Sequence, residues 1–546
     1  MCALPDWCEG LPDAEGMRAI DRWAIETRGV PSLELMERAG LGVARELERA
    51  FPEGPVAALC GRGNNGGDGL VVARLLREAG RPTRVLCTAA GKHLSEDARA
   101  NFERLPGEAL MVLEEEDGGD AWRGHPALVG AGVILDALLG TGFAGSPRGG
   151  VARAIAAAND SPAPVVSVDV PSGVDASSGV VAGDAVRAAL TVSFHAGKPG
   201  LWIHPGKGLA GEVRRIEIGI PRGAPAEARV GLISPRVLAE LPHRGALSTK
   251  LSGGHVLVAG GSRDLSGAPR MAALACLRAG AGYVTAYLPE SLQGTLAGGL
   301  LEVMTRGLPE RHGELTPAGV QAVLDGLDAG RVVDAAVGAD APGVGSRRAG
   351  LGTGAGALVL GPGLGRGSGA ASFARELAIR APGALVLDAD GLNAFAGDAG
   401  ALAAREGPTV LTPHAGELAR LLGCERAEIE GERLSRVRAA AEQTAAVVVL
   451  KGDDTLIAEP GGMVAVSPGG SPGLATAGTG DVLSGVIGAL LAQGLDAFTA
   501  ACAGVWLHVR AGREAARRQG SAEGVIASDV IAALPAARAP EPEPGE

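Results

Sequence analysis

One repeating pattern limits the possible folds of this chain more than any other feature. Short apolar runs, most of them rich in valine and leucine, end in turns of glycine and polar residues, and amphipathic stretches follow. This alternation is typical of strand–helix units and argues against sandwiches and helical bundles. We therefore predict an α/β protein with two parallel sheets. The expected strands are 56–60, 84–87, 132–135 and 165–168 in the first half, and 255–259, 358–360, 384–387, 409–411 and 447–450 in the second.

Length and one break in the pattern predict two domains. A chain of 546 residues is too long for one ordinary core, because domains usually contain about 100–200 residues. Around 221–229 the sequence PRGAPAEAR has two prolines, mixed charge and no apolar periodicity, so we place a boundary there. The expected domains are 1–225 and 226–546. Residues 11–49 have helical spacing and are expected to pack on the first sheet, whereas 306–356 show too little periodicity for an assignment.

Charge and cysteine content narrow the possible partners and compartments. The formal net charge is -12, which disfavours nucleic acid and anionic lipid, because both repel an acidic protein. The seven cysteines are never spaced as CxxC, which indicates a reduced protein without structural zinc. Charged residues interrupt the N-terminal segment, so no secretory signal is expected. We expect a cytoplasmic protein that neither enters a membrane nor binds nucleic acid.

The first glycine-rich turn carries polar groups suited to a nucleotide. It follows the expected strand 56–60 as GRGNNGGDG, in which Gly61, Gly63 and Gly66 match GxGxxG. Such a turn directs backbone N–H groups toward an anion. The next expected strand lacks the acidic residue that holds a ribose in ordinary dehydrogenases, which disfavours that class. The oxygens of NNGGD can hold ribose hydroxyls or a cation, and a plain strand-to-helix turn is the alternative.

Two further polar clusters follow expected strands of the first half. They are LDALLGTGFAGSPRG at 135–149 and VDVPSGVDASSG at 168–179. Because loops at the carboxyl ends of parallel strands converge on one crevice, we expect Asp136, Asp169 and Ser172 to meet the NNGGD loop. Buried carboxylates need a partner, which an alkali cation or a substrate hydroxyl can provide. Taken singly, each aspartate is also explained as a cap of a turn or helix.

The turns of the second half suit phosphoryl transfer. GTGD at 478–481 places N–H groups and a carboxylate at the start of a long apolar helix, and phosphoryl transfer needs both an anion hole and a base. No GxxxxGK[ST] occurs, so P-loop chemistry is excluded. Helix capping is the alternative for GTGD, and a single histidine such as His414 is more often structural. Other strands are followed by LKGDDTLI at 450–457, TPHAGEL at 412–418, DADGLN at 388–393 and GPGLG at 361–365.

Together these motifs resemble those of the bifunctional NAD(P)H-hydrate repair enzymes over nearly the whole chain. NNGGDG, DALLGTG and VDVPSGVD resemble the epimerase half, and GPGLG, DADGLN, TPHAGE and AGTGDVLSG resemble the ADP-dependent dehydratase half. The resemblance implies a Rossmann-like α/β/α domain followed by a ribokinase-like α/β/α domain. It also implies two activities in metabolite repair: an isomerase that interconverts R- and S-NAD(P)HX at C6, and a lyase that dehydrates the S epimer at the expense of ADP.

The same resemblance implies roles for individual residues. Asp169 is the expected acid/base group of the epimerase, and Asp481 is the expected base of the dehydratase. Potassium is expected at Asn65, Asp136 and Ser172. The residues expected to bind the hydrated nucleotide are Asn64, Asn65, Gly66, Gly67, Asp68, Gly140, Thr141, Gly142 and Ser146 in the first domain, and Ala268, Gly365 and His414 in the second. The residues expected to bind the adenine nucleotide are Lys451, Gly452, Asp453, Asp454, Thr455 and Gly480.

The resemblance also implies the small molecules. They are NADHX and NADPHX, a potassium ion for the epimerase, and ADP or ATP with magnesium for the dehydratase, and we expect a homo-oligomer. One departure from the family pattern is Thr249, where histidine is expected before Lys250. Two alternatives stay open. The chain can be a ribokinase-like kinase of a small vitamin-precursor alcohol fused to a dinucleotide-binding regulatory domain, or its first domain can be a non-catalytic sensor.

Overall fold

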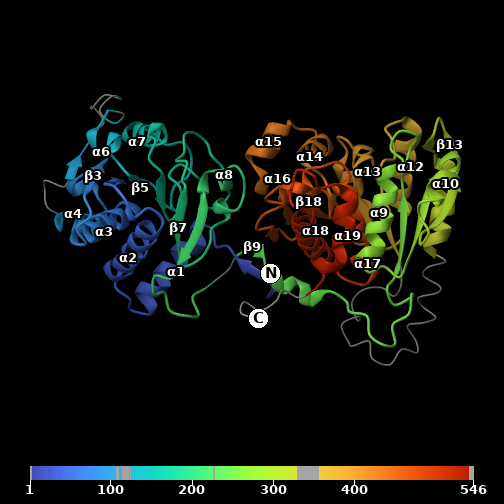
Figure 1. Cartoon of the computed structure of the whole chain (residues 1–546), viewed down its shortest axis with the longest axis horizontal. Coiled ribbons are helices and arrows are strands. Elements are labelled where there is room, and N and C mark those ends of the chain that lie inside the picture. Colours follow the sequence, from blue (N-terminus) through green and yellow to red (C-terminus); the bar gives the residue numbers. More distant parts are fainter. Residues whose placement is uncertain are drawn as a thin grey trace.

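A computed structural model describes residues 3–105, 110–112, 122, 124–225, 228–328 and 356–539 of the chain. Figure 1 shows two lobes, one built mainly from the N-terminal part of the chain and the other from the C-terminal part. Each lobe contains one large, mostly parallel sheet with apolar cores on both faces. The α/β class predicted from the alternating pattern is confirmed.

The first lobe has a seven-stranded sheet in the order β4-β3-β2-β5-β6-β7-β8, and its neighbouring strands are parallel. The four strands predicted for this half correspond to β2, β3, β5 and β6. The strands are β2 (Val56–Cys60), β3 (Thr83–Cys87), β4 (Leu110–Val112), β5 (Val133–Ala137), β6 (Val165–Val168), β7 (Leu190–Phe194) and β8 (Glu212–Ile216).

Helices cover both faces of this sheet. One face is covered by α1 (Ala14–Arg22), α2 (Ser32–Ala50) and α3 (Asn64–Glu78), and the other by α7 (Gly149–Asp160). The helical run predicted for 11–49 is interrupted, because the π-helical turn η1 (Trp23–Thr27) is followed by Gly29, whose left-handed φ of 71° does not continue a helix. The lobe also contains η2 (Gly91–His93), α4 (Glu96–Glu103), α6 (Pro126–Val129), η4 (Pro199–Leu201) and α8 (Lys207–Ala210).

The second lobe is built on an eleven-stranded sheet in the order β1-β9-β20-β19-β18-β17-β16-β15-β10-β11-β12. The strands from β18 to β12 are parallel, whereas β19 and β20 pair antiparallel. The five strands predicted for this half correspond to β10 and β15 to β18. The strands are β10 (His255–Ala259), β11 (Tyr283–Pro289), β12 (Met304–Leu308), β15 (Ala357–Leu360), β16 (Leu385–Leu387), β17 (Thr409–Leu411), β18 (Val447–Leu450), β19 (Leu456–Ala458) and β20 (Val464–Val466).

Helices again cover both faces. One core contains α9 (Gly267–Arg278), α17 (Thr479–Ala492), α18 (Ala497–Gln519) and α19 (Ala527–Ala537), and the other contains α12 (Ser368–Arg380), α14 (Ala415–Leu422) and α16 (Arg433–Thr444). The other elements are η5 (Pro235–Glu240), α10 (Glu290–Ala297), β13 (Glu310–Arg311), β14 (Glu314–Leu315), η6 (Pro317–Gly319), α13 (Asp390–Asn393), η8 (Ala399–Ala404), α15 (Arg426–Gly431) and η9 (Pro472–Leu474). Of the unassigned stretch 306–356, residues 329–355 lie outside the described residues. Among the described helices, none has the length and apolar character needed to cross a membrane.

The first strand of the chain belongs to the second lobe. β1 (Cys8–Gly10) pairs antiparallel with β9 (Val230–Ile233), and Trp7 stacks on Phe498 with ring centroids 6.2 Å apart. The chain therefore crosses between the lobes after β1 and again before β9. The boundary at 225/226 stays a prediction, with residues 8–10 contributing to the second sheet.

Candidate active sites of the two lobes

In the first lobe, a cavity lies where the strand order reverses. β2 and β5 are neighbours, and the chain continues from them toward opposite edges of the sheet, so the loops that follow them separate and leave a crevice. The cavity has a volume of about 520 Å³. The loops after β2, β5 and β6 meet there, as expected from the topology. Its lining includes Asn64, Asn65, Asp68, Gly140, Thr141, Gly142 and Asp169.

Asp169 is held beside this cavity in an uncommon conformation. Its φ is 66°, in a left-handed region that costs a residue with a Cβ about 1–3 kcal/mol and often marks a functional site. Lys198 Nζ lies 2.5 Å from Asp169 Oδ1, and Thr141 Oγ1 donates to Oδ2. Lys198 is fully buried and also donates to Ser193 Oγ and the Phe194 carbonyl. Both oxygens of the Asp169 carboxylate are therefore fixed in orientation.

Besides Asp97, two other carboxyl groups line the same cavity, those of Asp68 and Asp21. Burial, together with the nearby charge of Asp169, raises the pKa of both groups above the ordinary range. The Asp68 carboxyl makes no hydrogen bond or ion pair with any residue that the structure describes, so it is available to a ligand. A carboxyl group that keeps its proton to higher pH can donate that proton to a substrate oxygen.

The three residues predicted to bind potassium surround the backbone of Leu139. Ser172 Oγ donates to Asp136 Oδ1 and accepts from the Leu139 N–H at 2.8 Å, and Asn65 Nδ2 donates to the Leu139 carbonyl at 2.8 Å. Asp136 is fully buried, which raises its pKa although Ser172 and Ser167 donate to it. Carboxylate, hydroxyl, amide and carbonyl oxygens are the ligands that hard cations prefer. The donor set therefore fits an alkali ion.

Close packing explains why residues 66 and 67 are glycines. A Cβ on Gly66 would lie 1.9 Å from the Gly61 carbonyl oxygen, and a Cβ on Gly67 would lie 2.7 Å from Met36 Cε. Neither glycine is part of the cavity lining, and the same is true of Ser146. Their contact with substrate stays a prediction.

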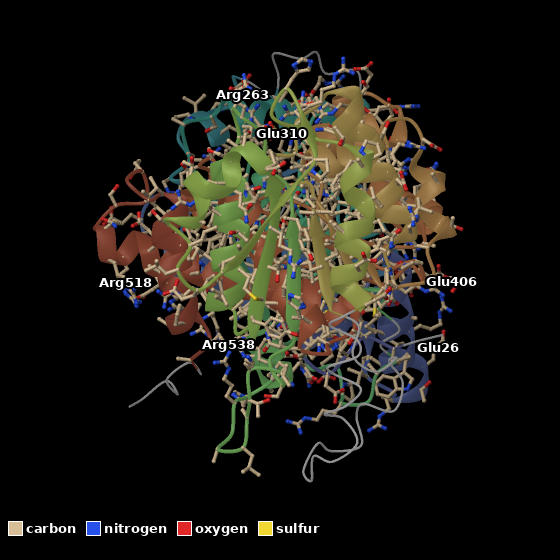
Figure 2. The ribbon with its side chains drawn as sticks, turned by 90° about the vertical axis from the view of Figure 1, so that its right-hand side faces the viewer. Glu26, Arg263, Glu310, Glu406, Arg518 and Arg538 are labelled. Carbon is tan, nitrogen blue, oxygen red and sulfur yellow. The ribbon has the colours of Figure 1, made fainter. Side chains whose placement is uncertain are left out.

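The second lobe repeats this arrangement with other residues. Its strand order reverses between β10 and β15, where the same topological rule predicts a binding crevice. Figure 2 shows Arg263 and Glu310, which follow β10 and β12, at one end of the sheet, and Arg538 at the opposite end. At the carboxyl ends of the strands, the Gly365 N–H donates to Asp390 Oδ2 at 3.1 Å. The loops that follow β15 and β16 are therefore in contact.

Lys451 forms a charged cluster with carboxylates from neighbouring strand ends. Its Nζ lies 3.1 Å from Asp388 Oδ1 and 3.7 Å from Glu417 Oε2. Ser484 Oγ of α17 donates to the other oxygen of Asp388. A Cβ on Gly480 would lie 3.5 Å from Lys451 Nζ. The structure thus places the lysine of LKGDD beside the start of the helix that carries GTGD.

Asp481 lies in the first turn of α17. Burial and the charge of Asp388 raise its pKa to about 7, although Lys451 acts in the opposite direction. The N–H groups in the first turn of a helix lack intrahelical partners and favour an anion. A carboxyl group that titrates near neutral pH next to an anion site is suited to act as a base.

Two predicted substrate residues lie at helix starts. His414 caps α14, because its Nδ1 accepts the N–H groups of Gly416 and Glu417 while the Glu417 carboxylate accepts the His414 N–H. Ala268 lies in the first turn of α9, 3.0 Å from the position of a Cβ on Gly363. Contact of His414 or Ala268 with substrate stays a prediction.

The predicted nucleotide loop, residues 451–455, is closed by Thr455. Thr455 Oγ1 accepts the Gly452 N–H at 3.2 Å and donates to the Gly452 carbonyl at 2.7 Å. Asp453 pairs with Lys207, and the buried Asp454 pairs with Arg433. Both carboxylates thus have protein partners, and their contact with a nucleotide stays a prediction.

Sequence reasoning missed several residues of these sites. Lys198, Asp21 and Arg433 are absent from the predicted sets, although the first two line or border the first cavity. The rarity of lysine could have indicated Lys198 as a functional residue, because the chain contains only five lysines. Three of the five form ion pairs at or between the candidate sites, namely Lys198, Lys207 and Lys451.

Known proteins match both lobes. Residues 32–200 match the family described as YjeF-related protein N-terminus, and residues 256–536 match NAD(P)H-hydrate dehydratase. The bifunctional NAD(P)H-hydrate repair enzyme Nnr of Moorella thermoacetica is 40% identical over 538 residues, which cover 96% of each chain. The enzyme of the same name from Salinibacter ruber is 40% identical and covers 97% of this chain and 96% of its own.

A solved structure is similar to part of this chain. It is an ADP/ATP-dependent NAD(P)H-hydrate dehydratase from Bacillus subtilis, co-crystallized with ATP/Mg2+, with a TM-score of 0.44 and 29% identity over 56% of this chain and 96% of that chain. The two family matches and the near full-length relatives agree with the order of the two sites along the sequence. The chain therefore belongs to the family of bifunctional NAD(P)H-hydrate repair enzymes.

Proposed function

We propose that the first domain interconverts the R and S forms of hydrated NADH and NADPH at C6, and that the second domain dehydrates the S form with ADP as the phosphoryl donor. Membership of the family supports both activities. The observation that carries the assignment is the Asp169 carboxylate, which Lys198 and Thr141 orient beside a cavity that is also lined by the Asp68 carboxyl.

The first reaction needs an acid and a base near C6. Hydration of the nicotinamide ring leaves a hydroxyl on C6, next to N1. When that hydroxyl leaves as water and a water molecule adds to the opposite face, the configuration at C6 is inverted. Asp68, whose raised pKa favours the protonated form, donates the proton to the leaving hydroxyl, and Asp169 accepts the proton of the water that adds. Lys198 and Thr141 act through Asp169 and orient its carboxylate.

The oxygen cluster around Leu139 is the proposed potassium site. Asn65, Asp136 and Ser172 would hold the ion. Its charge would offset the negative charge of a bound dinucleotide phosphate. The protein groups of this cluster also tie the loop after β2 to the loop after β5.

The second reaction uses phosphorylation to create a leaving group. Asp481 accepts the proton of the C6 hydroxyl as that oxygen attacks the terminal phosphoryl group of the nucleotide, and the N–H groups at the start of α17 stabilise the phosphoryl oxygens. Lys451 adds positive charge at the same helix start. The electron pair of N1 then expels phosphate from C6, and loss of a C5 proton restores the C5=C6 double bond. ADP or ATP would bind with magnesium.

One pair of variants tests whether the first domain carries the epimerase activity and the second the dehydratase activity. Full-length Asp169→Asn and Asp481→Asn proteins are each supplied with pure S-NADHX and with pure R-NADHX, in the presence of ADP, magnesium and potassium. Asp169→Asn should form NADH from the S form only, and Asp481→Asn should interconvert the two forms without making NADH. NADH formation at the wild-type rate by Asp481→Asn contradicts the proposed base, and rapid use of the R form by Asp169→Asn contradicts the proposed acid/base group.

We also propose that the enzyme works in a reducing compartment such as the cytoplasm. The six cysteines that the structure describes are all unpaired, which supports a reducing environment.

A further inference from the structure

The segment from Lys198 to Lys207 joins the first cavity to the second lobe. At its beginning, Lys198 Nζ contacts the Asp169 carboxylate. The segment then passes through η4 to α8, which Figure 1 shows on the side of the first lobe that faces the second. At its end, the first lobe contacts residues 453 and 454 of the predicted nucleotide loop.

Three contacts with the first lobe hold these residues, and the longest joins His204 Nε2 and Asp453 Oδ2 at 3.8 Å. Lys207 Nζ lies 2.5 Å from Asp453 Oδ2 and also donates to the Asp453 carbonyl at 3.3 Å. The His204 backbone N–H donates to Asp454 Oδ2 at 2.8 Å, and Arg433 Nε donates to the same oxygen at 2.8 Å. Asp454 is only 1% exposed, so its carboxylate depends on these donors for compensation of its buried charge.

The rest of the loop is held by the second lobe itself. Lys451, at its start, pairs with Asp388, and Thr455, at its end, hydrogen-bonds with Gly452. Asp453 and Asp454 form the middle of the loop and face the first lobe. On the other side of Asp453, the Gly470 N–H donates to Oδ1 at 2.9 Å. The conformation of the loop is therefore set jointly by both lobes.

We propose that Lys207 is a positioning residue for the nucleotide site: the first domain holds loop 451–455 in its nucleotide-binding conformation, so that ADP affinity in the second domain depends on a contact made by the first. This inference rests on the proposed role of loop 451–455 in nucleotide binding. Loss of this contact should change nucleotide binding more than the chemical step, because among the described residues Lys207 pairs with Asp453 and makes no contact with Asp481.

The test compares steady-state kinetics of full-length Lys207→Met with wild type, with ADP as the varied substrate and pure S-NADHX in excess. Because Asp453 is more than half exposed, we expect a modest rise of about 3- to 5-fold in KM for ADP, with kcat changed by less than about twofold. Lys207→Arg should restore KM. Lys92→Met, which removes an exposed lysine elsewhere on the first lobe, is the matched control and should behave like wild type.

A second variant separates positioning from general damage. Asp453→Asn should raise KM for ADP by at least the same factor, because it also weakens the contact with His204 and alters a predicted nucleotide residue. The double variant should be no worse than Asp453→Asn, because both changes weaken the contact between Lys207 and Asp453. Unchanged KM in Lys207→Met and Asp453→Asn overturns the inference, and so does a fall in kcat or in epimerase activity that accompanies the change. The proposed function fails by a different result, namely wild-type protein that makes no NADH from S-NADHX and ADP.

Discussion

Lys198 and Asp169 form an ion pair in which Nζ lies 2.5 Å from Oδ1 and the lysine side chain is fully buried. The pair joins the end of β6 to the segment that follows β7. Lys198 fixes one oxygen of the proposed acid/base residue, and Thr141 fixes the other.

Replacement of Lys198 by methionine should impair epimerisation and stability together. The substitution leaves Asp169 without its charged partner, and breaking a buried pair in this way costs about 3–5 kcal/mol. We expect R-to-S conversion to fall by about a hundredfold, with a lower free energy of unfolding measured in urea. Dehydration of pure S-NADHX by the second domain should be unaffected and serves as the internal control. Wild-type epimerase activity in Lys198→Met would show that the pair is dispensable.

Gly66→Ala and Gly63→Ala form a matched pair that tests the packing of the NNGGD turn. A Cβ on Gly66 would lie 1.9 Å from a backbone oxygen, whereas a Cβ on Gly63 meets nothing within 4 Å. We expect Gly66→Ala to lower the free energy of unfolding by about 1–3 kcal/mol and Gly63→Ala to leave it nearly unchanged. Thermal unfolding of both proteins measures the difference, and equal stability would mean that the turn relaxes freely.

Asp481 should give the dehydratase a pH dependence. Its pKa of about 7 means that the ionised base becomes available as pH rises, so kcat/KM for S-NADHX should increase up to about pH 7 and then level off. The folded-state pKa lies above the unfolded value, so this group stabilises the fold less as pH rises from about 4 to about 7. Asp481→Asn should be inactive as a dehydratase because it lacks the base. Above neutral pH it should also be more stable than wild type, because it removes the buried charge. A flat profile of kcat/KM between pH 6 and 8 would contradict the assignment.

Ser172→Ala and Ser167→Ala distinguish the proposed potassium site from simple support of Asp136. Both serines donate to the Asp136 carboxylate, so each substitution should cost about 1 kcal/mol of stability. Only Ser172 is a proposed ligand of the ion. Epimerase rates measured against potassium at constant ionic strength should therefore require more potassium in Ser172→Ala, but not in Ser167→Ala. The same potassium dependence in both variants would remove Ser172 from the site.

Several fully buried strands were predictable because they lie in apolar runs. β2, β6, β10, β17 and β18 have the predicted ends. β1 was not predictable, because three residues that include an exposed glutamate carry no strand pattern, and their pairing with β9 depends on how the second lobe is assembled. The break at Gly29 was missed because the apolar spacing of 11–49 continues across it.

The candidate sites were predictable where several strand-end motifs share one edge of a sheet. The topology of parallel strands brings Asn65, Thr141 and Asp169 to one cavity. Lys198 and Lys207 were missed because each owes its role to a partner far along the chain, Asp169 and Asp453. A sequence pattern shows local periodicity, but it does not show which charged residue, far away in the sequence, contacts a buried lysine.

In the proposed function one chain both supplies and consumes the S form, and a single assay of NADH absorbance follows both activities. Wild-type protein is mixed with R- and S-NADHX in known proportion, together with ADP, magnesium and potassium, and the formation of NADH is followed over time. We expect NADH to continue to form beyond the initial amount of the S form, faster than uncatalysed epimerisation allows. A plateau at the initial amount of the S form would contradict the epimerase assignment, and the absence of NADH would contradict both.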